Sequence, residues 1–430
     1  MRVLLAGATG MIGQALLGKL AAAGHEVVLG VRDVERTRRQ WPGARVVHLD
    51  FAELGQERPG QARRWPAQLA EIEAVINAVG IFREQGSQTF DALHVKGPGA
   101  LFEAAAAAGV SRVVQISALG AEPGSQAGYL ASKGLADDAL LRLDVMATVV
   151  QPSLVFAPQG PSTRWFALLA ALPVTPLPGG GKQWIQPVHL DDLGDAVVRL
   201  LGSHAPPPRL HAVGARPLTL RAYLACLKQG LGVSGWFLSV PLRLTQAMAR
   251  LLALRPGSLV TPEALRMLEA GNVGDPEEFA AVLGRPPKDA ADFIAERDRA
   301  TMRRAAQLDW LVPLLRYAVA IMWIVTGVVS AFVFPVGSSL GLLARTGLAG
   351  VPALVALYGA AALDALLGIA PLVSTRRRGI YRLQLFLVAF YTVVITLCLP
   401  EFWAHPYGPV LKNLPLLAAI AVLHELDDGE

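Results

Sequence analysis

The chain opens with Arg2-Val3-Leu4-Leu5-Ala6-Gly7-Ala8-Thr9-Gly10-Met11-Ile12-Gly13, and this stretch decides the fold of its first half. A short apolar run, typical of a buried strand, comes first, and a helix-like run, Ile12–Ala23, follows the glycines. In a strand–loop–helix unit of this kind, Gly7 allows a tight turn, Gly10 lets the backbone approach a pyrophosphate, and Gly13 lets helix and strand pack closely. The helix N-terminus attracts phosphate. The stretch therefore predicts a Rossmann domain that binds a dinucleotide.

Strand-like and helix-like stretches alternate over residues 1–215. The expected strands, rich in Val and Ile, are Arg2–Ala6, Glu26–Val31, Ala44–Leu49, Ala74–Ala78, Arg112–Ser117 and Ala147–Gln151. The expected helices include Ile12–Ala23, Val34–Gln40, Gly97–Ala108 and Tyr129–Arg142. This alternation predicts an α/β domain with a doubly wound parallel sheet.

Two further regions follow this domain. Residues 216–303 are helical in pattern and punctuated by proline, which predicts a small helical lobe that shapes a substrate cleft. Residues 304–430 are mostly apolar. Leu314–Phe334, Leu348–Val373 and Ile380–Leu399 are long enough to cross a bilayer, and Pro409–Leu423 is a shorter fourth candidate. We expect an α-helical transmembrane bundle of about four helices.

Positive charges predict the orientation of these spans. Arg303-Arg304 precedes the first span, and Arg376-Arg377-Arg378 lies between the second and the third. Such clusters face the cytoplasm. We therefore expect a multi-pass protein of the cell inner membrane, with the lipid bilayer as a partner and the Rossmann domain in the cytoplasm.

The composition agrees with a soluble part joined to a membrane part. Hydrophobic residues make up 53% and charged residues 17%, which is more apolar than an average soluble domain. The formal net charge of +5 comes from scattered arginines and not from a basic stripe with aromatic residues, so no nucleic-acid partner is expected. Two cysteines, Cys226 and Cys398, do not make a disulfide framework.

The residues expected to bind the dinucleotide follow the strand ends. In the first loop they are Gly7, Thr9, Gly10, Met11, Ile12 and Gly13; Arg32, Asp50, Asn77, Ala78, Val79 and Gly80 follow later strands. The planar guanidinium of Arg32 suits a ribose 2′-phosphate, which favours NADP(H). The neighbouring Asp33 keeps NAD(H) open, because an acidic residue there binds the 2′-hydroxyl.

Tyr129-Leu130-Ala131-Ser132-Lys133 is the main chemical signal. Residues four apart share one face of a helix, so the ammonium of Lys133 is expected to lower the pKa of the Tyr129 phenol. The phenol then exchanges a proton while hydride moves to or from a nicotinamide. Ser117, at the end of the preceding strand, is expected to hold the substrate oxygen.

In these motifs the chain resembles an extended or atypical short-chain dehydrogenase/reductase. The segment Pro152–Pro158 resembles the family's stretch after the sixth strand, with Pro152 at the cofactor, and Gln186–Leu193 resembles a branch that includes the nucleotide-binding accessory subunit of respiratory complex I. The resemblance implies that Tyr129 is the acid/base, that Lys133 binds both the ribose and the phenol, and that Ser117 orients the substrate.

Two positions depart from the family pattern. Lys96 stands where the family often has an asparagine tied to a proton relay, and Gln151 stands where an arginine commonly precedes the Pro-Ser pair. The first departure weakens the case for full catalysis. His189 with Asp191 and Asp192 favours a loop and a helix cap over a metal site, so no metal is expected.

Residues 310–425 resemble the DoxX-like family of small four-helix membrane proteins, most specifically in His405–Pro415. Asp364 lies in the middle of an expected span. A carboxyl group there is costly and should face the bundle interior, either as a functional group or as a packing contact.

Three functions are consistent with this pattern. The favoured one is a membrane-tethered NAD(P)H-dependent oxidoreductase that reduces a small apolar carbonyl or quinone-like substrate. The alternatives are a non-catalytic NADPH-binding module that docks a membrane redox partner, and an NAD(P)-dependent sugar epimerase or dehydratase that uses the same Tyr129 and Lys133.

Overall fold

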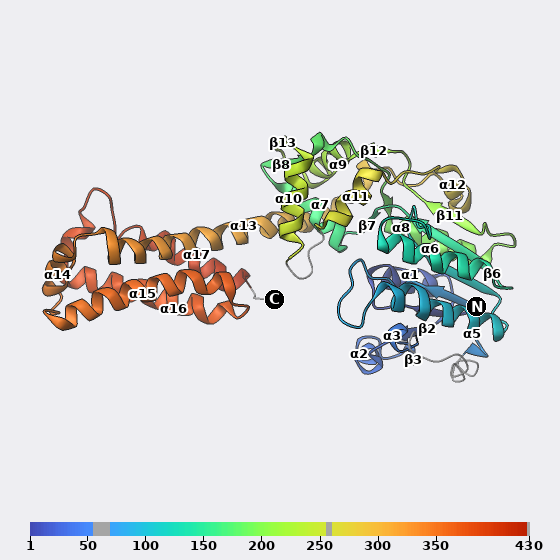
Figure 1. The fold of residues 1–430 in the computed structure, drawn as a ribbon, viewed down its shortest axis with the longest axis horizontal. Helices are drawn as coiled ribbons and strands as arrows, with labels where there is room; N and C mark the ends of the chain where they lie inside the picture. The colour runs from blue at the N-terminus through green and yellow to red at the C-terminus, as the bar shows by residue number, and fades with distance from the viewer. Residues whose placement is uncertain (55–68, 255–259, 428–430) are drawn as a thin grey trace. The chain divides into compact units, whose positions relative to one another are not determined.

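The computed structural model describes residues 1–54, 69–254 and 260–427. They form two compact units, Met1–Arg304 and Ala305–Glu430. The boundary falls inside helix α13 (Glu296–Val328), which is continuous across it (Figure 1). Each unit has its own core and is described separately.

The first unit is built on a parallel sheet of seven strands. The strands are β1 (Arg2–Ala6), β2 (Glu26–Val31), β3 (Arg45–His48), β4 (Ala74–Asn77), β5 (Arg112–Ile116), β6 (Met146–Pro152) and β11 (Arg209–Ala212). Their order is β11-β6-β5-β4-β1-β2-β3, and every neighbouring pair is parallel. The order reverses between β1 and β4, which is where ligands bind in open α/β sheets. The predicted doubly wound parallel sheet is confirmed, and β11 extends it at one edge.

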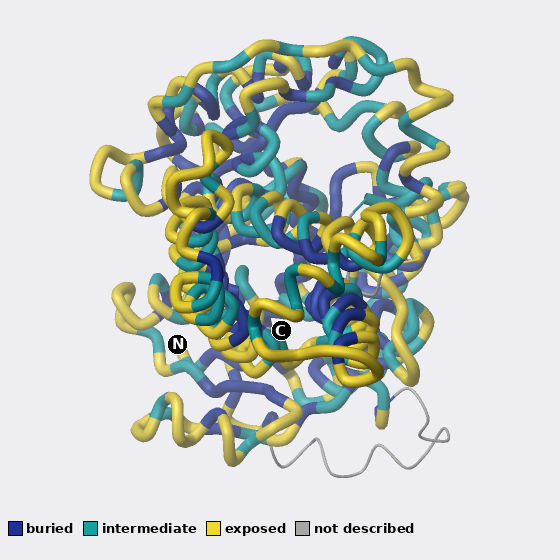
Figure 2. The backbone as a smooth tube through the Cα atoms, turned by 90° about the vertical axis from the view of Figure 1, so that its left-hand side faces the viewer, coloured by how far each residue is buried: buried dark blue, intermediate teal, exposed yellow. Residues whose placement is uncertain are grey.

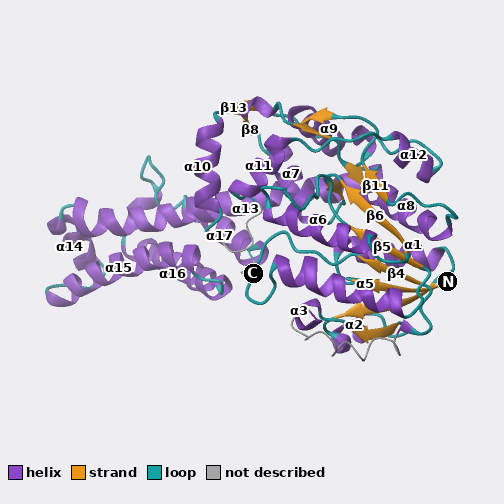
Figure 3. Ribbon diagram, turned by 45° about the vertical axis from the view of Figure 1, so that its right-hand side comes forward, coloured by secondary structure: helices purple, strands orange, loops and turns teal. Residues whose placement is uncertain are grey.

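Helices cover both faces of this sheet (Figure 3). They are α1 (Met11–Ala22), α2 (Val34–Gln40), α3 (Phe51–Leu54), α5 (Gly97–Ala107), α6 (Gly128–Leu141) and α8 (Leu190–Gly202). Apolar residues of α1 and α8 share one core with the sheet, and those of α5 and α6 share the other. Gly24 and Gly109 have φ of 80° and 73°, so each ends its helix in the left-handed conformation expected after a helical run.

The region predicted as a helical lobe also contains a two-residue strand, β12 (Leu218–Thr219), and a longer strand. Its helices are α9 (Leu220–Leu231), α10 (Leu242–Leu252), α11 (Pro262–Ala270) and α12 (Glu277–Leu283). Strand β13 (Trp236–Val240) pairs in parallel with β8 (Val174–Pro178), which follows α7 (Pro161–Ala171). Strand β13 forms by pairing with a strand about 60 residues earlier in the chain, so no local sequence pattern predicts it. Phe279 of α12 packs into the core shared by α1 and α8.

The second unit is a bundle of long helices. Helix α13 continues as a π-helix, η4 (Val329–Val333), and α14 (Val336–Arg345), α15 (Val351–Val373), α16 (Arg377–Cys398) and α17 (Asn413–Leu426) follow. By length and composition, three helices of the described residues are apolar enough to cross a membrane: Glu296–Val333, Val351–Val373 and Arg377–Cys398. Helix α17 has 14 residues and falls short of that length. The connection between the first two of these helices contains the shorter helix α14.

Four helices of the bundle share one apolar core, to which Val319, Leu367, Leu387 and Ile420 contribute. Gly327 of α13 and Gly368 of α15 allow these two helices to approach closely, and a Cβ at Gly368 would lie 2.8 Å from the Ala320 carbonyl oxygen. A Cβ at Gly327 would lie 2.5 Å from the Ala361 carbonyl oxygen. Many apolar side chains on the outer surface of these helices are exposed, and Figure 2 draws exposed residues in yellow. An exposed apolar surface of this extent is typical of helices surrounded by lipid.

A buried ionic cluster lies at one end of the bundle. Asp427, which follows α17, accepts hydrogen bonds from Arg316 of α13 at 2.5 and 2.6 Å and from Arg377 of α16 at 3.2 Å. The hydroxyl of Tyr381 donates to the same carboxylate. Two arginines and one carboxylate therefore link the middle of α13 to the start of α16 and the end of α17.

Candidate active site

The glycine loop between β1 and α1 forms a cradle of bare backbone. Gly7 has φ of +80°, and a Cβ there would lie 2.9 Å from the Ala78 carbonyl carbon. A Cβ at Gly13 would lie 2.1 Å from the Gly7 carbonyl oxygen. Gly10 is the N-cap of α1, and Thr9 and Gly10 are exposed. The helix therefore begins beside an open surface with its first N–H groups available to a phosphate, which fits the pyrophosphate of a dinucleotide.

The end of β2 presents a basic side chain. Arg32 is exposed there, while Asp33 is the N-cap of α2 and accepts a hydrogen bond from the Arg36 N–H at 2.9 Å. Asp50 likewise caps the start of α3 through the Ala52 N–H at 2.8 Å. Because both carboxylates hold backbone N–H groups, Arg32 is the side chain at this edge best suited to a 2′-phosphate.

The stretch after β4 lies between the glycine loop and helix α6. Asn77 is fully buried; its amide donates to Gln115 at 2.7 Å and its oxygen accepts from the Val79 N–H at 3.0 Å. Asn77 therefore links the ends of β4 and β5 through its side chain. Ala78 and Val79 are half-buried and Gly80 is exposed. A Cβ at Gly80 would lie 3.1 Å from Lys133 Nζ, so bare backbone lies against that ammonium.

Lys133, on α6, is buried at the ends of two strands. Its Nζ donates to the carbonyl oxygens of Val79 and Ile116, each at 3.1 Å. Burial lowers the pKa of Lys133 to about 8, and the charge of Asp137 partly opposes this. The ammonium remains the main form at neutral pH.

Tyr129 lies one turn earlier on α6, among aromatic rings. Its ring centroid is 5.2 Å from Phe82, 6.2 Å from Phe90 and 5.6 Å from His94. Burial, followed by the charge of Asp137, raises the pKa of Tyr129 to about 12. The lowered pKa expected from Lys133 was therefore wrong, because burial outweighs any effect of the ammonium. The phenol is protonated at neutral pH and is suited to donate a proton.

His94 is a residue of this site that the sequence analysis missed. It is fully buried in a π-helix, η1 (Asp91–Lys96), a form often found at functional sites. Its Nε2 accepts from the Ile81 N–H at 3.0 Å, so Nδ1 carries the proton and donates to Ser132 Oγ at 2.9 Å. Burial, followed by the charge of Lys133, lowers the pKa of His94 to about 3 and keeps the ring neutral. The one local signal for His94 in the sequence was its place in His94-Val95-Lys96-Gly97, the segment in which Lys96 departs from the family pattern.

Lys96, the departure noted in the sequence, points elsewhere. Its ammonium lies 2.7 Å from the Asp91 carboxylate, and both side chains are largely exposed. Two residues apart on a helical backbone, His94 and Lys96 project in different directions. His94 is therefore the member of this segment that lies beside Tyr129.

Ser117 is held by a buried carboxyl group. Its Oγ donates to Asp137 Oδ2 at 2.5 Å, and the Gln151 amide donates to the same oxygen at 3.2 Å. Burial raises the pKa of Asp137. Pro152, next to Gln151, is buried at the end of β6. The bond to Asp137 engages the hydroxyl that was expected to orient substrate.

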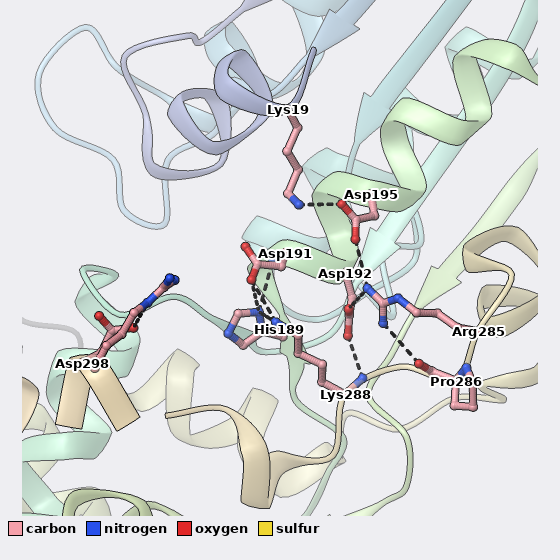
Figure 4. Close-up of polar contacts among 10 residues, drawn as sticks. Lys19, His189, Asp191, Asp192, Asp195, Arg285, Pro286, Lys288 and Asp298 are labelled. Carbon is pink, nitrogen blue, oxygen red and sulfur yellow. Dashed lines mark hydrogen bonds and ion pairs between the residues drawn. The ribbon is translucent and has the colours of Figure 1, made fainter. Parts of the chain in front are cut away.

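The segment His189–Asp192 starts a helix, as predicted, and its cap is the histidine. His189 Nδ1 accepts from the Asp191 N–H at 3.1 Å. Figure 4 shows that the two aspartates face basic side chains: Lys288 lies 2.9 Å from Asp191, and Arg285 lies 2.6 Å from the buried Asp192. These contacts tie α8 to the segment that follows α12.

Comparison with known proteins agrees with both halves of the chain. Residues 7–175 match a family model described as NAD(P)H-binding, and residues 320–421 match the DoxX-like family. The chain joins an NAD(P)-binding Rossmann domain to a C-terminal DoxX-like domain. This domain and the three apolar helices indicate association with a membrane.

Curated relatives match the Rossmann domain. Subunit 9 of the NADH dehydrogenase [ubiquinone] 1 alpha subcomplex of Arabidopsis thaliana is 30% identical over 205 residues, which cover 45% of this chain and 48% of the relative. A ceramide reductase of Caulobacter vibrioides is 29% identical over 197 residues, 46% of this chain and 59% of the relative. The chain thus spans about half the length of these relatives.

Solved structures show the same fold. A nucleoside-diphosphate-sugar epimerase of Staphylococcus aureus matches with a TM-score of 0.54 at 17% identity. The match covers 69% of this chain and 100% of the epimerase chain. The UDP-glucuronic acid 4-epimerase of Bacillus cereus matches with a TM-score of 0.51 at 15% identity. The match covers 71% of this chain and 99% of the epimerase chain. At these identities the likeness shows that the first unit shares the fold of these proteins.

Proposed function

We propose that this protein is a membrane-tethered, NADPH-dependent reductase of a small apolar carbonyl or quinone-like substrate. One observation carries the proposal: Tyr129 and Lys133 lie one turn apart on α6, and the Lys133 ammonium binds carbonyl oxygens at the ends of β4 and β5. These strand ends adjoin the glycine cradle of β1, because β4 is the neighbour of β1 in the sheet. The acid and the dinucleotide site therefore share one edge.

The protonation states favour reduction. When bound, NADPH would supply the hydride. With a ketone, the hydride would add to the carbonyl carbon and the proton would go to the oxygen, so that the C=O double bond becomes a C–O single bond with one new C–H and one new O–H bond. The proton would come from the Tyr129 hydroxyl, which is protonated because its pKa is about 12. The Lys133 ammonium stabilises the phenolate left behind until solvent returns a proton. A ketone would give the alcohol and NADP⁺. A quinone would take up the same hydride and proton overall but would end with an O–H group at each of its two oxygens, giving the hydroquinone and NADP⁺.

The surroundings of Tyr129 favour an apolar substrate. Phe82 and Phe90 flank its ring, and Phe82 is 42% exposed, so an apolar surface borders the acid. The relative named ceramide reductase acts, by its name, on a lipid. A substrate dissolved in the bilayer also gives the membrane domain a purpose, since tethering brings enzyme and substrate together.

Tyr129→Phe tests the proposal. Purified full-length protein in lipid nanodiscs is assayed for NADPH oxidation with long-chain ketones and quinones, and NADPH binding is measured by fluorescence. We expect the variant to lose turnover by a factor of roughly 10²–10⁴, the usual contribution of a positioned acid, and to bind NADPH as wild type does. Tyr317→Phe, in the membrane unit, is the control. Undiminished turnover in Tyr129→Phe would rule out the assigned acid.

A second candidate is a non-catalytic NADPH-binding module that docks a membrane redox partner. The hydrogen bond from Ser117 to Asp137 favours it, because that hydroxyl is engaged away from substrate. The relatives named as complex I subunits are in line with it. Tight NADPH binding without turnover on any substrate would support this function. Retained cofactor with isomerisation of a nucleotide sugar would instead support an epimerase.

We propose the cell inner membrane as the location, with the Rossmann domain in the cytoplasm. The arginines at 376–378 precede or begin α16 and would remain on the cytoplasmic side. Labelling of single cysteines from each side of sealed vesicles tests this orientation. Labelling of position 376 only from the outside of right-side-out vesicles would reverse it.

A further inference from the structure

Helix α10 carries an apolar stripe that points away from the protein. Ala249 is fully buried and marks the inner side of the helix. The opposite side, at helical spacing, presents Leu244, Met248 and Leu251, and Leu251 is 69% exposed. A helix packed against a core normally buries such a stripe, so this one is built to contact something other than water.

Strand β13, which leads into α10, extends the apolar surface. Trp236 is 82% exposed and Leu238 is also exposed, because alternate residues of a strand share a face. Phe237 points to the other side, where the charged groups of Arg221 and Lys228 lie over its ring. We call Trp236, Leu238, Leu244, Met248 and Leu251 the α10 surface.

The charges on the chain segment that forms the α10 surface have one sign. No acidic residue occurs between Ser234 and Thr261. Arg243 and Arg250 are exposed and, seven residues apart, lie on the same border of the apolar stripe. An apolar stripe bordered by arginine, with a tryptophan beside it, is the pattern of a helix that lies in the headgroup region of an anionic bilayer.

We propose that the α10 surface inserts into the interface of the membrane to which this protein is tethered. A bilayer is the occupant that the observations favour, because the same chain contains helices long and apolar enough to span one. A protein anchored in a bilayer always has lipid close to it, whereas a separate protein partner would have to be recruited. The arginine border matches anionic headgroups, each basic residue near the surface adding to the attraction.

This contact would bring the proposed catalytic site to the lipid surface. The guanidinium of Arg83 donates to the Ala253 carbonyl oxygen, at the end of α10, at 2.9 Å. Arg83 follows Phe82, whose ring packs on Tyr129. On α11, the Glu263 carboxylate accepts from the Tyr129 N–H at 3.4 Å. A helix seated in the headgroups would thus lie beside the approach to Tyr129, a consequence that rests on the proposed function.

Spin-label accessibility tests the contact without measuring turnover. Cys226 and Cys398 are replaced by serine, and single cysteines are placed at Met248 or Leu251 in the full chain. The labelled protein is put into nanodiscs containing anionic lipid. Collisions with oxygen, which concentrates in lipid, are compared with collisions with a water-soluble nickel chelate. Glu103→Cys, an exposed position on α5, is the control.

We expect both stripe labels to be open to oxygen and shielded from the chelate, and the control to show the reverse. Labels open to the chelate would show that the surface faces water. Labels shielded from both reagents would show that protein covers it, either a second copy or another part of the chain. Either result would overturn the proposal, whatever the enzymatic activity.

A kinetic measurement separates this proposal from the reductase activity itself. Leu251→Glu should raise the KM for a bilayer-dissolved ketone roughly tenfold by repelling the interface. It should leave kcat, NADPH affinity and the KM for a short water-soluble ketone unchanged. Equal KM values for the bilayer-dissolved ketone in variant and wild type would contradict the role in substrate access. Lack of turnover in both proteins would count against the proposed function and leave the accessibility result to decide the contact.

Discussion

His94 Nδ1 lies 2.9 Å from Ser132 Oγ, although the two residues are 38 positions apart in the chain. The serine hydroxyl in turn donates to the Tyr129 carbonyl oxygen at 2.8 Å. The imidazole therefore supports the first turn of α6 through one hydrogen-bond chain. Its ring also packs edge-on against Tyr129, 5.6 Å between centroids.

His94→Ala should lower kcat by roughly 10²-fold, because a misplacement of the acid by about 1 Å has an effect of that size. NADPH affinity should not change, since His94 lies beside Tyr129 and not at the glycine loop. His94→Asn keeps a donor near Ser132 and should recover part of the rate. Steady-state kinetics and NADPH titration measure this. A fall in Tm with no change in kcat would mean that His94 only supports the fold.

The reduction rate should depend on the charge of Lys133. Its pKa of about 8 lies below the ordinary value for lysine, so the ammonium is present below pH 8 and is lost as pH rises above it. Tyr129 stays protonated throughout this range, because its pKa is about 12. We expect kcat to be level from pH 6 to about 7.5 and to fall above pH 8. A level profile up to pH 9.5 would exclude a role for this charge.

Gly13→Ala should abolish dinucleotide binding. The new Cβ would lie 2.1 Å from the Gly7 carbonyl oxygen, so the cradle must open. We expect the Kd for NADPH to rise at least about 100-fold, or roughly 2.7 kcal/mol. Gly18→Ala is the matched control on the same helix, because no atom lies within 4 Å of its Cβ position. The control should bind NADPH normally and gain up to about 1 kcal/mol in stability. Equal NADPH binding by both variants would contradict the assigned phosphate loop.

Arg32→Ala should reduce the preference for NADPH. Loss of a hydrogen bond to a charged phosphate amounts to about 1.5–3 kcal/mol, which raises the Kd for NADPH roughly 10- to 100-fold. The Kd for NADH should stay the same. Arg36→Ala, also exposed, is the control. Isothermal titration with both dinucleotides measures the effect, and equal losses for the two would point to a general loss of fold.

In the DoxX-like domain, Asp427→Ala should destabilise the bundle by up to about 3 kcal/mol, because the half-buried Arg316 and Arg377 would lose their shared carboxylate. Glu425→Ala, at an exposed carboxylate next to the same helix end, should have little effect. Thermal unfolding in detergent measures both. An unchanged Tm for Asp427→Ala would show that the cluster adds no net stability.

Local patterns in the sequence were sufficient for much of the fold. Strands β1 and β2 have the predicted bounds, and the other predicted strands of the sheet differ by one residue at one or both ends. The reason is physical: strand burial, helix periodicity and the left-handed glycines Gly7, Gly24 and Gly109 each depend on a few neighbouring residues. The long apolar helices follow from composition, so the positions of the three spans were predictable, although the first helix begins at Glu296 and not at the expected Leu314, and the fourth candidate is too short to count as a span.

Only the tertiary structure decided how the site is supported. His94 contacts Ser132 across 38 positions of the chain, and Asp137 contacts Ser117 across 20. Glu263 contacts Tyr129 across 134 positions. The direction of the Tyr129 pKa shift depends on burial, and the spacing of Tyr129 and Lys133 in the sequence does not predict how deeply the phenol is buried. Sequence by itself therefore determined the Rossmann domain, its glycine loop and the apolar spans, because those rest on local geometry and hydrophobicity. Folding decided which distant side chains meet and how far water is excluded from them, and these set the chemistry.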